Sequence, residues 1–378
     1  MSRRRTIYAG VVLLLLGVLG GLVYALLSLG QTARSFEVEV APGFRHIRSI
    51  YGASEELEDL LHGPYGISAR EGEIFVSDNQ KAAVYVFNTD GEFLRRIGEK
   101  GRGPGQLVQP LGIHVDEQGR LYVADRGHNK VVVYDVEGDL IDEIVFQEQA
   151  PVVPYTADSK LYVATEGPIG LFDQSSRQFL TSWGERGRSQ DEFDYVNGLV
   201  WDEQNDRMIV SDTNNLRLKA VDSDGVAQWV LGGRTESGLT EEGKRLFGLP
   251  SGITLVEGIV YVADPLNNVI HLVSSEGEYL AEVGETGSEE GYFSFPTHIA
   301  YLGDNRFAVT EWGNGRVQIV EINAESAIDG YEKEKEERLA PPRFEDEEEI
   351  GGPVTTSTAP VTASSAPTSA LVTTSTAP

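Results

Sequence analysis

Short runs of β-branched and aromatic residues, separated by turn-forming pairs, recur along the middle of the chain. One unit contains residues 74–78 (IFVSD), residues 84–87 (VYVF) and the pair Asp90-Gly91. The next unit repeats this order with residues 121–125 (LYVAD) and 131–134 (VVVY). Runs of this kind joined by Asp-Gly or Glu-Gly are typical of antiparallel strands connected by tight turns. The middle of the chain is therefore predicted to be all-β.

The same unit returns at intervals of roughly 47 residues, which is the spacing of a repeat architecture. The third copy, residues 161–165 (LYVAT), departs most, because it lacks both the acidic residue and the Gly-Ile start. Four short strands per repeat, arranged radially, make a β-propeller. The position that ends the second strand falls at Asp78, Asp125, Thr165, Asp212, Asp264 and Glu311. Six copies predict six blades.

The last repeat lacks a final strand, and the missing piece lies at the other end of the domain. A final strand is visible in residues 92–98, 178–184 and 278–284, whereas the sixth copy stops at residues 317–320 (VQIV). Residues 44–52 (FRHIRSIYG) have the same character. We predict a propeller over residues 44–323 in which residues 44–52 close the last blade and leave no open sheet edge.

These residues resemble the NHL-repeat family. The family pattern has a Pro-x-Gly-Ile start, a Tyr-Val-Ala-Asp strand, an Asn-rich turn and a third strand containing Val. Residues 110–133 match it, and it recurs around Asp212 and Asp264. The resemblance covers about residues 44–323 and implies a six-bladed NHL-type propeller.

The N-terminus has the pattern of a membrane anchor. Arg3, Arg4 and Arg5 precede an uncharged, largely apolar run over residues 7–30, which is long enough to span a bilayer. The basic side of such a run stays in the cytoplasm. We predict a cytoplasmic stub and transmembrane helix over residues 1–30, a linker over residues 31–43 and a propeller outside the cell membrane. The alternative is a cleaved signal peptide ending near residues 28–30, which would also export the propeller.

The C-terminal end has a composition that cannot bury a core. Residues 331–350 are dominated by charged side chains, and residues 351–378 consist mainly of Thr, Ser, Ala, Pro and Val. Such segments are typical of disordered tails. We therefore predict a disordered tail over residues 324–378.

Charge and cysteine content exclude several kinds of chemistry. The chain has 59 acidic and 31 basic residues and a net charge of -28, which repels nucleic-acid phosphates. It has no cysteine, so disulfides and thiolate metal sites are excluded. Nucleic acid is therefore not an expected partner.

Basic residues gather in the turns and loops predicted for the face that points away from the membrane. Loops on a rigid scaffold commonly carry function, and Trp beside Arg is common at binding hot spots. The alternative is a solvated face whose charges pair with nearby Asp and Glu. We predict a binding or scaffold module for a protein or an anionic cell-envelope polymer, with no catalytic residue and no cofactor. The candidate binding residues are Lys100, Arg102, Arg126, Lys130, Arg186, Arg188, Arg217, Arg234, Trp312 and Arg316.

An enzyme is the second hypothesis. His62, His128 and His298 fall on neighbouring blades 1, 2 and 6. Related six-bladed enzymes such as the amidating lyases hold zinc with histidines from different blades. The alternative is thus a metal-dependent lyase or lactonase-like enzyme with zinc or calcium at the top of the central channel. A third hypothesis is a structural spacer in an envelope assembly.

Two further motifs have structural interpretations. The Asp that ends the second strand of most repeats is expected to accept backbone N–H groups of the turn that follows it. A metal site needs side chains that converge, and repetition in every blade does not provide that. The glycine-rich residues 98–105 lack the ending of a phosphate-binding loop and are expected to connect two blades.

Overall fold

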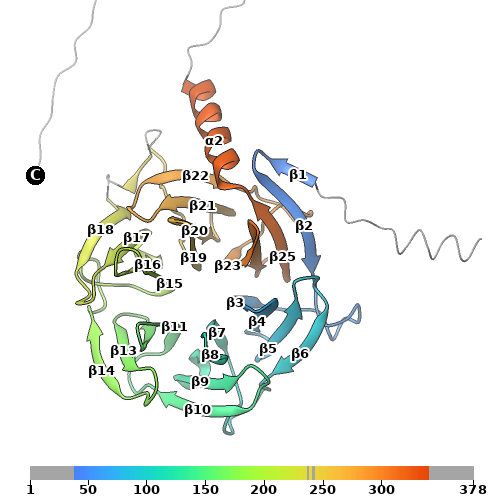
Figure 1. Ribbon diagram of the computed structural model, residues 1–378, viewed down its shortest axis with the longest axis vertical. Helices are drawn as coiled ribbons and strands as arrows, with labels where there is room; N and C mark the ends of the chain where they lie inside the picture. The colour runs from blue at the N-terminus through green and yellow to red at the C-terminus, as the bar shows by residue number, and fades with distance from the viewer. Residues whose placement is uncertain (1–37, 236–237, 241–242, 340–378) are drawn as a thin grey trace, which may run out of the picture. The chain divides into compact units, whose positions relative to one another are not determined.

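Each repeat forms one antiparallel sheet, and six sheets stand around a central axis in the computed structural model (Figure 1). The structure describes residues 38–235, 238–240 and 243–339. Residues up to Glu337 group into one compact unit, and the second unit, from Arg338, contributes only the last two described residues. The predicted all-β, six-bladed propeller is confirmed.

The strands of a blade follow one another from the central axis outward. Blade 1 contains β3 (Pro64–Arg70), β4 (Glu73–Asp78), β5 (Ala83–Asn88) and β6 (Phe93–Ile97). Blade 2 contains β7 (Pro110–Val115), β8 (Arg120–Asp125), β9 (Lys130–Asp135) and β10 (Leu140–Val145), with η1 (Arg126–His128) between β8 and β9. Blade 3 contains β11 (Pro151–Ala157), β12 (Lys160–Thr165), β13 (Ile169–Asp173) and β14 (Phe179–Trp183).

The other three blades have the same order, and the last carries one more strand. Blade 4 contains β15 (Val196–Asp202), β16 (Arg207–Asp212), β17 (Arg217–Val221) and β18 (Ala227–Gly232), with η2 (Thr213–Asn215) after β16. Blade 5 contains β19 (Ile253–Val256), β20 (Ile259–Asp264), β21 (Val269–Ser274) and β22 (Tyr279–Val283). Blade 6 contains β23 (Pro296–Gly303), β24 (Arg306–Glu311), β25 (Arg316–Ile322), β2 (Phe44–Ile50) and β1 (Val38–Ala41).

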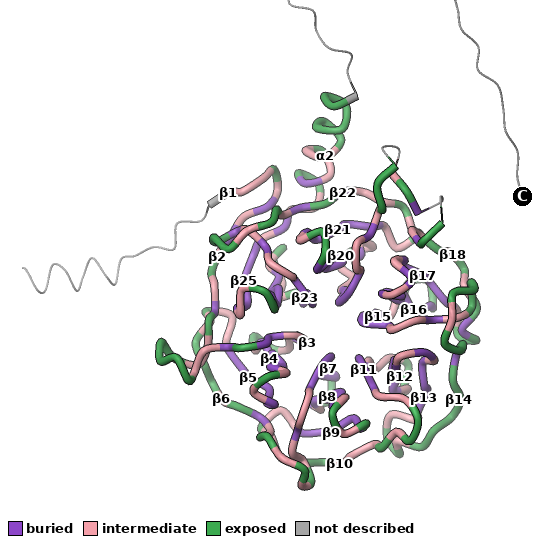
Figure 2. The backbone as a smooth tube through the Cα atoms, turned by 180° about the vertical axis from the view of Figure 1, so that it is seen from behind, coloured by how far each residue is buried: buried purple, intermediate pink, exposed green. Residues whose placement is uncertain are grey.

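The core is divided into clusters between neighbouring blades. Ile97, Leu107 and Val123 belong to the cluster between blades 1 and 2, and five further clusters join the other neighbours. Because each blade packs on both faces, the second strands are almost entirely buried (Figure 2). Burying one large apolar side chain contributes about 1.5–3 kcal/mol, so these interfaces supply most of the driving force for folding.

The Gly-Ile start of a repeat has a steric cause. A Cβ atom on Gly112 would lie 2.7 Å from the backbone oxygen of Val152 on the next blade. Neighbouring inner strands approach so closely at this height that glycine is needed. Blade 6 has His298 at the corresponding position, and that side chain occupies the central channel region instead.

The repeated Asp tightens the loops around it, as expected. Asp264 accepts hydrogen bonds from the backbone N–H groups of Leu266 and Asn267 in the following turn, both at 3.2 Å. It also accepts from Gly248 at 2.7 Å and Leu249 at 2.9 Å, in the loop that enters the same blade. One buried carboxylate thus joins two loops at one end of a blade.

Residues from both ends of the propeller form blade 6. β2 pairs antiparallel with β25, with Phe44 opposite Ile322 and Ile50 opposite Val317. β1 then pairs with β2 on the outside. The interpretation of residues 31–43 as a linker is therefore wrong for Val38–Ala41. The chain reverses direction between β1 and β2. Val38 therefore lies beside His46, away from the end of the blade at which β2 begins.

The region after β25 needs a second correction. Residues 324–378 were predicted to be disordered, but Ala324–Leu339 forms the helix α2. Asn323 caps it, because its side-chain oxygen accepts a hydrogen bond from Ser326 N at 2.9 Å. Ala324, Ala327, Ile328 and Tyr331 follow helical spacing and pack on the core between blades 5 and 6.

No helix within the described residues is long and apolar enough to cross a membrane. The predicted anchor, residues 7–30, and the Thr- and Ser-rich residues 351–378 lie outside the described part of the chain.

Candidate functional site

One face of the ring carries all the loops between blades. Because the strands of a blade are antiparallel, these loops lie at the same end as the turns between second and third strands. We call this the connecting face. Residues 98–109 connect β6 with β7 there, so the glycine-rich segment is a blade-connecting loop, as expected.

Three of the predicted binding residues are not on the surface, which is a correction. Lys130, Arg217 and Arg316 are 6%, 8% and 1% exposed. Arg316 Nε donates to Glu311 Oε1 at 2.6 Å, and Lys130 Nζ donates to Glu143 Oε1 at 2.6 Å. Charges buried this deeply must be paired, so these side chains stabilise the connecting face from below and do not form it.

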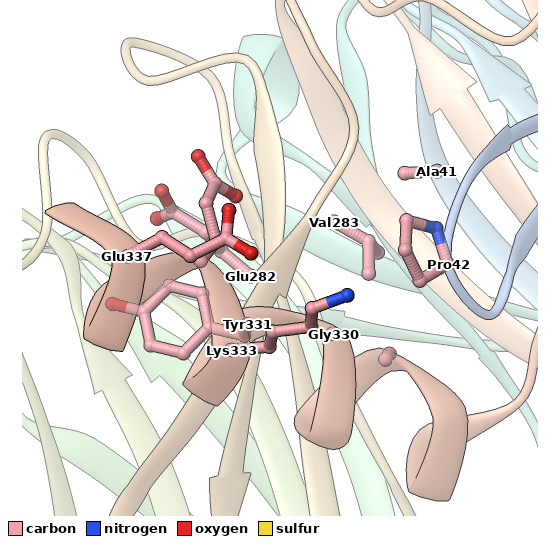
Figure 3. Close-up of a pocket in the computed structure, with 10 residues that line it drawn as sticks. Ala41, Pro42, Glu282, Val283, Gly330, Tyr331, Lys333 and Glu337 are labelled. Atoms are coloured by element: carbon pink, nitrogen blue, oxygen red, sulfur yellow. The ribbon is translucent and has the colours of Figure 1, made fainter. Parts of the chain in front are cut away.

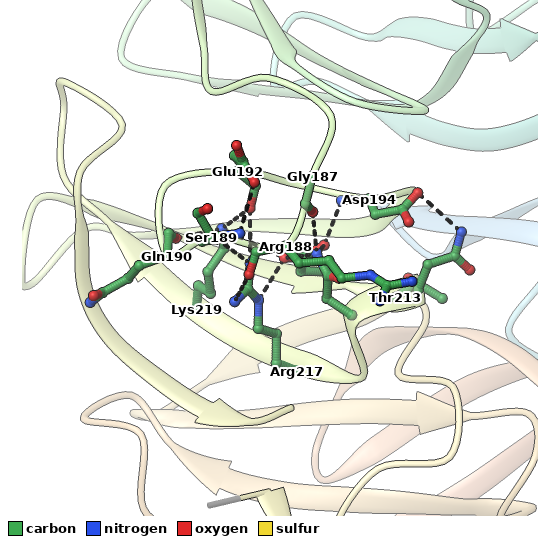
Figure 4. A network of polar contacts seen from close by, with 12 residues as sticks. Gly187, Arg188, Ser189, Gln190, Glu192, Asp194, Thr213, Arg217 and Lys219 are labelled. Atoms are coloured by element: carbon green, nitrogen blue, oxygen red, sulfur yellow. Dashed lines mark hydrogen bonds and ion pairs between the residues drawn. The ribbon is translucent and has the colours of Figure 1, made fainter. Parts of the chain in front are cut away.

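Arg217 works together with Lys219, which is fully buried (Figure 4). Arg217 Nε donates to Asp212 Oδ2 at 2.7 Å, and its Nη atoms donate to the carbonyl oxygens of Arg188 and Ser189 at 3.2 and 2.7 Å. Lys219 Nζ donates to the carbonyl oxygen of Gln190 at 3.0 Å. Two buried cations thus hold the loop that carries Arg186 and Arg188.

Arg126 and Arg186 lie on the connecting face, where both are paired with acidic residues. Arg126 Nη2 donates to Glu166 Oε1 at 2.6 Å, and Arg186 lies 3.3 Å from Asp194 Oδ1 and 3.8 Å from Glu166 Oε2. Arg126 Nε is buried and has no hydrogen-bond partner among the described residues. The hydrogen bond that Arg126 donates to Glu166 raises the pKa of Arg126. These pairs join blades 2, 3 and 4.

The remaining four cations are exposed. The side chains of Lys100, Arg102 and Arg188 have no hydrogen bond or ion pair within the part of the chain that the structure describes. Arg234 is also exposed, but its Nε donates to the carbonyl oxygen of Asn214 at 2.8 Å. Lys100 and Arg102, on the loop between blades 1 and 2, and Arg188, on the loop between blades 3 and 4, are therefore free to meet an anionic group.

Trp312 adds an aromatic surface on blade 6. It lies in the turn between β24 and β25, is 43% exposed, and its ring centroid lies 5.8 Å from that of Phe295. An exposed indole supported by a second ring can bury a large apolar area in a complex.

Polar side chains from opposite blades meet across the central channel. Tyr65 of β3 donates its phenol proton to Asn197 Oδ1 of β15 at 3.1 Å, and Asn197 Nδ2 donates to Ser251 Oγ at 3.0 Å. His298 Nε2 lies 3.1 Å from the carbonyl oxygen of Asn197. These contacts join residues of blades 1, 4, 5 and 6 across the ring axis.

Tyr195 lies beside Tyr65 and has an unusual backbone. Its φ is 59°, in the left-handed region that bulky residues rarely adopt, and its N–H donates to the carbonyl oxygen of Glu166 at 3.2 Å. Burial raises the pKa of both phenols, so they stay protonated as hydrogen-bond donors. Arg126, Glu166, Tyr65 and Tyr195 thus converge from four blades.

The histidines of the enzyme hypothesis do not form a metal site. No group of three or more His, Asp or Glu side chains suited to a metal ion occurs among residues 38–235, 238–240 and 243–339. His128 Nδ1 lies 2.7 Å from Asp125 Oδ2, and burial lowers the pKa of His298 to about 4. His62 is exposed, so the three do not provide a zinc or calcium ligand set.

The residues that meet across the ring axis were missed from the sequence, although a signal for them exists. Tyr65 and Asn197 hold one position of the repeat, directly before Gly66 and Gly198. Serine and threonine stand at the same position in blades 5 and 6, as Ser251 and Thr297. A polar residue before the Gly of several repeats therefore marks the channel. Glu166 and Tyr195 had no such repeated signal.

A known family covers part of this chain. The family described as a 6-bladed beta-propeller matches residues 57–167. NHL repeat-containing protein 3 of Homo sapiens is 28% identical over 111 residues, which are 25% of this chain and 31% of that protein. Protein lin-41 of Caenorhabditis elegans is 45% identical over 47 residues, 12% of this chain and 4% of that protein. This chain therefore spans less than a third of these relatives.

Solved structures agree on the fold. A protein of unknown function from Bacteroides thetaiotaomicron has a TM-score of 0.58 and 16% identity, over 73% of this chain and 75% of that chain. A gluconolactonase from Xanthomonas campestris has a TM-score of 0.54 and 13% identity, over 76% of this chain and 94% of that chain. At such low identity these similarities show the fold alone. The protein is a six-bladed β-propeller built from NHL-type repeats.

Proposed function

We propose that this protein is a membrane-tethered, extracytoplasmic binding or scaffold module whose connecting face binds a protein or an anionic envelope ligand. The observation that carries the proposal is the set of three exposed cations, Lys100, Arg102 and Arg188, on two equivalent loops. Each lacks an ion-pair partner among the described residues, although the chain has a large excess of acid. Unpaired cations on an otherwise acidic protein favour contact of an anionic partner with the face that carries them.

The surroundings of these cations suit binding. The loops that carry them are fixed from below by buried ion pairs, so little order would be lost on binding. Trp312 offers apolar contact on the same face, and Trp with Arg is the common composition of binding hot spots. Arg126 contributes a buried Nε that still lacks an acceptor. Together these features favour a binding module over a structural spacer.

Capture by purified full-length protein tests the binding part of the proposal. The protein, held in detergent and immobilised, is incubated with solubilised envelope material at low and moderate salt. Native protein is expected to retain an anionic partner, and the K100E/R102E/R188E variant is expected to lose it. Surface charge contacts weaken with salt, so retention should also fall as salt is raised.

A matched variant controls for the change in net charge. Arg70, Lys160 and Arg306 lie at turns between first and second strands, on the opposite face, and pair with Glu71, Asp158 and Asp304. The R70E/K160E/R306E variant has the same net charge as the connecting-face variant and should retain the partner. Equal capture by the two variants would rule out the connecting face as the binding surface.

The tether is tested separately in cells. The uncharged residues 7–30 with Arg3, Arg4 and Arg5 before them support an anchor whose N-terminus is cytoplasmic. Protease added to intact cells should then degrade the propeller epitope. Degradation that requires lysis of the cells would place the propeller inside and contradict the proposed location.

A further inference from the structure

We propose that α2 is a proton-responsive clasp on the ring closure, held in place by a cluster in blade 5 in which the buried His271 and Asp264 lie behind the more exposed Tyr279 and Glu282. The clasp concerns the outer edge of blades 5 and 6, so it is independent of the proposed binding on the connecting face.

α2 holds the turn that joins β1 to β2. Asn323 N donates to the carbonyl oxygen of Gly43 at 2.8 Å. A Cβ atom on Gly330 would lie 2.7 Å from Pro42 Cβ, so the helix backbone rests directly on Pro42. Ala327 is buried in the same cluster as Phe44 and Ile322, the pair at which β2 meets β25. A displaced α2 would therefore uncover the closure of the ring.

On its other side α2 faces blade 5 across a pocket of about 270 Å³ (Figure 3). Tyr331 of α2 lies against Tyr279 of β22, with ring centroids 5.8 Å apart. Glu282 of β22 lines the pocket together with Lys333, Glu334 and Glu337 of α2. Three carboxylates and one ammonium group thus share the space between the helix and the blade.

His271 lies directly behind this contact and is fully buried. Its Nε2 lies 3.1 Å from Asp264 Oδ2, and its Nδ1 lies 3.0 Å from the Tyr279 hydroxyl and 3.4 Å from Glu282 Oε2. The Tyr279 hydroxyl donates to Glu282 Oε2 at 3.0 Å. Phe247 packs edge-on against the imidazole. A doubly protonated imidazole can therefore donate toward carboxylates on both sides.

The balance of these contacts favours the protonated imidazole. Burial alone lowers the pKa of His271, but hydrogen bonds to Asp264 and Glu282 outweigh it, and the pKa is raised above its ordinary value of 6.5. Because folding raises this pKa, the protonated His271 stabilises the folded state fully below pH 6.5. This stabilisation is lost as pH rises through the raised pKa. When the proton leaves, Asp264 and Glu282 lose the cation between them. Glu282 then faces Glu334 and Glu337 with less compensation.

Hydrogen exchange of the full-length protein tests the clasp. Amide protection of residues 324–339 and of β2 is measured from about pH 6 to pH 9, with intrinsic exchange rates removed. In native protein, protection of α2 should fall by about tenfold per pH unit between 6.5 and the raised pKa of His271. In the H271Q variant this fall should be absent. In the H114Q variant, which removes a half-buried histidine of the inner strand β7 whose pKa is lowered to about 4, it should remain.

A second variant keeps the test decisive if H271Q does not fold. Glu282→Gln keeps the shape of the side chain but removes one of the charges that raise the pKa of His271. The fall in protection of α2, which begins near pH 6.5, should therefore end at a lower pH than in native protein. Protection that does not depend on pH in native protein, or an unchanged fall in H271Q or E282Q, would overturn the clasp. None of these results bears on capture by the connecting face.

Discussion

Two equivalent side chains, Lys219 and Gln318, hold equivalent loops with different chemistry. In blade 6, Gln318 Nε2 donates to the carbonyl oxygen of Tyr292 at 2.8 Å and to Glu311 Oε1 at 2.7 Å, so Glu311 balances Arg316 alone. In blade 4, Lys219 Nζ lies 3.6 Å from Asp212 Oδ2 and 3.6 Å from the centroid of the Phe193 ring. Asp212 must therefore balance Arg217 and Lys219 together. Blade 4 buries a charge that blade 6 avoids.

The Lys219→Gln substitution is expected to stabilise the protein. Burial lowers the pKa of Lys219 to about 8, from 10.5, so the folded protein gives up this proton before the unfolded chain does. The free energy of unfolding of native protein should therefore rise as pH increases from 8 toward 10.5. The variant should lack this rise and gain about 1–2 kcal/mol at neutral pH, because a partly compensated buried charge is removed.

Urea denaturation at about pH 7 and pH 9.5 measures both effects. Lys130→Gln is the control, because it removes a buried lysine that has its own carboxylate, Glu143, and should leave the rise with pH in place. A Lys219→Gln variant that is less stable than native protein, and still gains stability with pH, would show that Lys219 is not the cause.

The strands are the elements that the sequence predicted best. Residues 121–125 and 131–134 are recognisable because each blade repeats the same buried pattern and the same turn chemistry. α2 was missed because the strong charge of residues 331–350 favoured a prediction of disorder. That charge outweighed the helical spacing of the apolar positions 324, 327, 328 and 331. The contact of Tyr65 with Asn197 depends on ring geometry, which joins blades 1 and 4 across the channel. A local sequence pattern cannot show which side chains meet across the ring. For the same reason it could not predict that Arg316 is buried.

Capping should decide how firmly α2 is held at its N-terminus. Asn323→Ala removes the acceptor of the Ser326 N–H and should cost about 1 kcal/mol of helix stability. Hydrogen exchange of residues 324–339 measures the change. Ser326→Ala keeps the cap, since Ser326 takes part through its backbone, and should have a smaller effect. Equal losses in both variants would mean that the cap does not stabilise α2.

For the whole molecule, charge is distributed unevenly over equivalent loops. Parallel bridges Lys100 to Leu107, Arg186 to Phe193 and Thr286 to Phe293 show that the same loop conformation occurs three times. The first loop carries Lys100 and Arg102 beside Glu99, the second carries Arg186 and Arg188 among four acidic residues, and the third carries acidic residues alone. The fold therefore provides a repeated scaffold whose charge differs from loop to loop. An anionic partner is expected near the unpaired cations, over the loops between blades 1 and 2 and between blades 3 and 4.

The affinity of a captured partner, measured for native protein and the two charge-matched variants at several salt concentrations, tests the account most directly. The account predicts that K100E/R102E/R188E binds at least tenfold more weakly at low salt and depends less on salt. It also predicts that R70E/K160E/R306E binds like native protein. Equal loss of affinity in both variants would mean that only net charge matters, and no loss in either would mean that the partner binds elsewhere. Either result would contradict the connecting face as the binding surface.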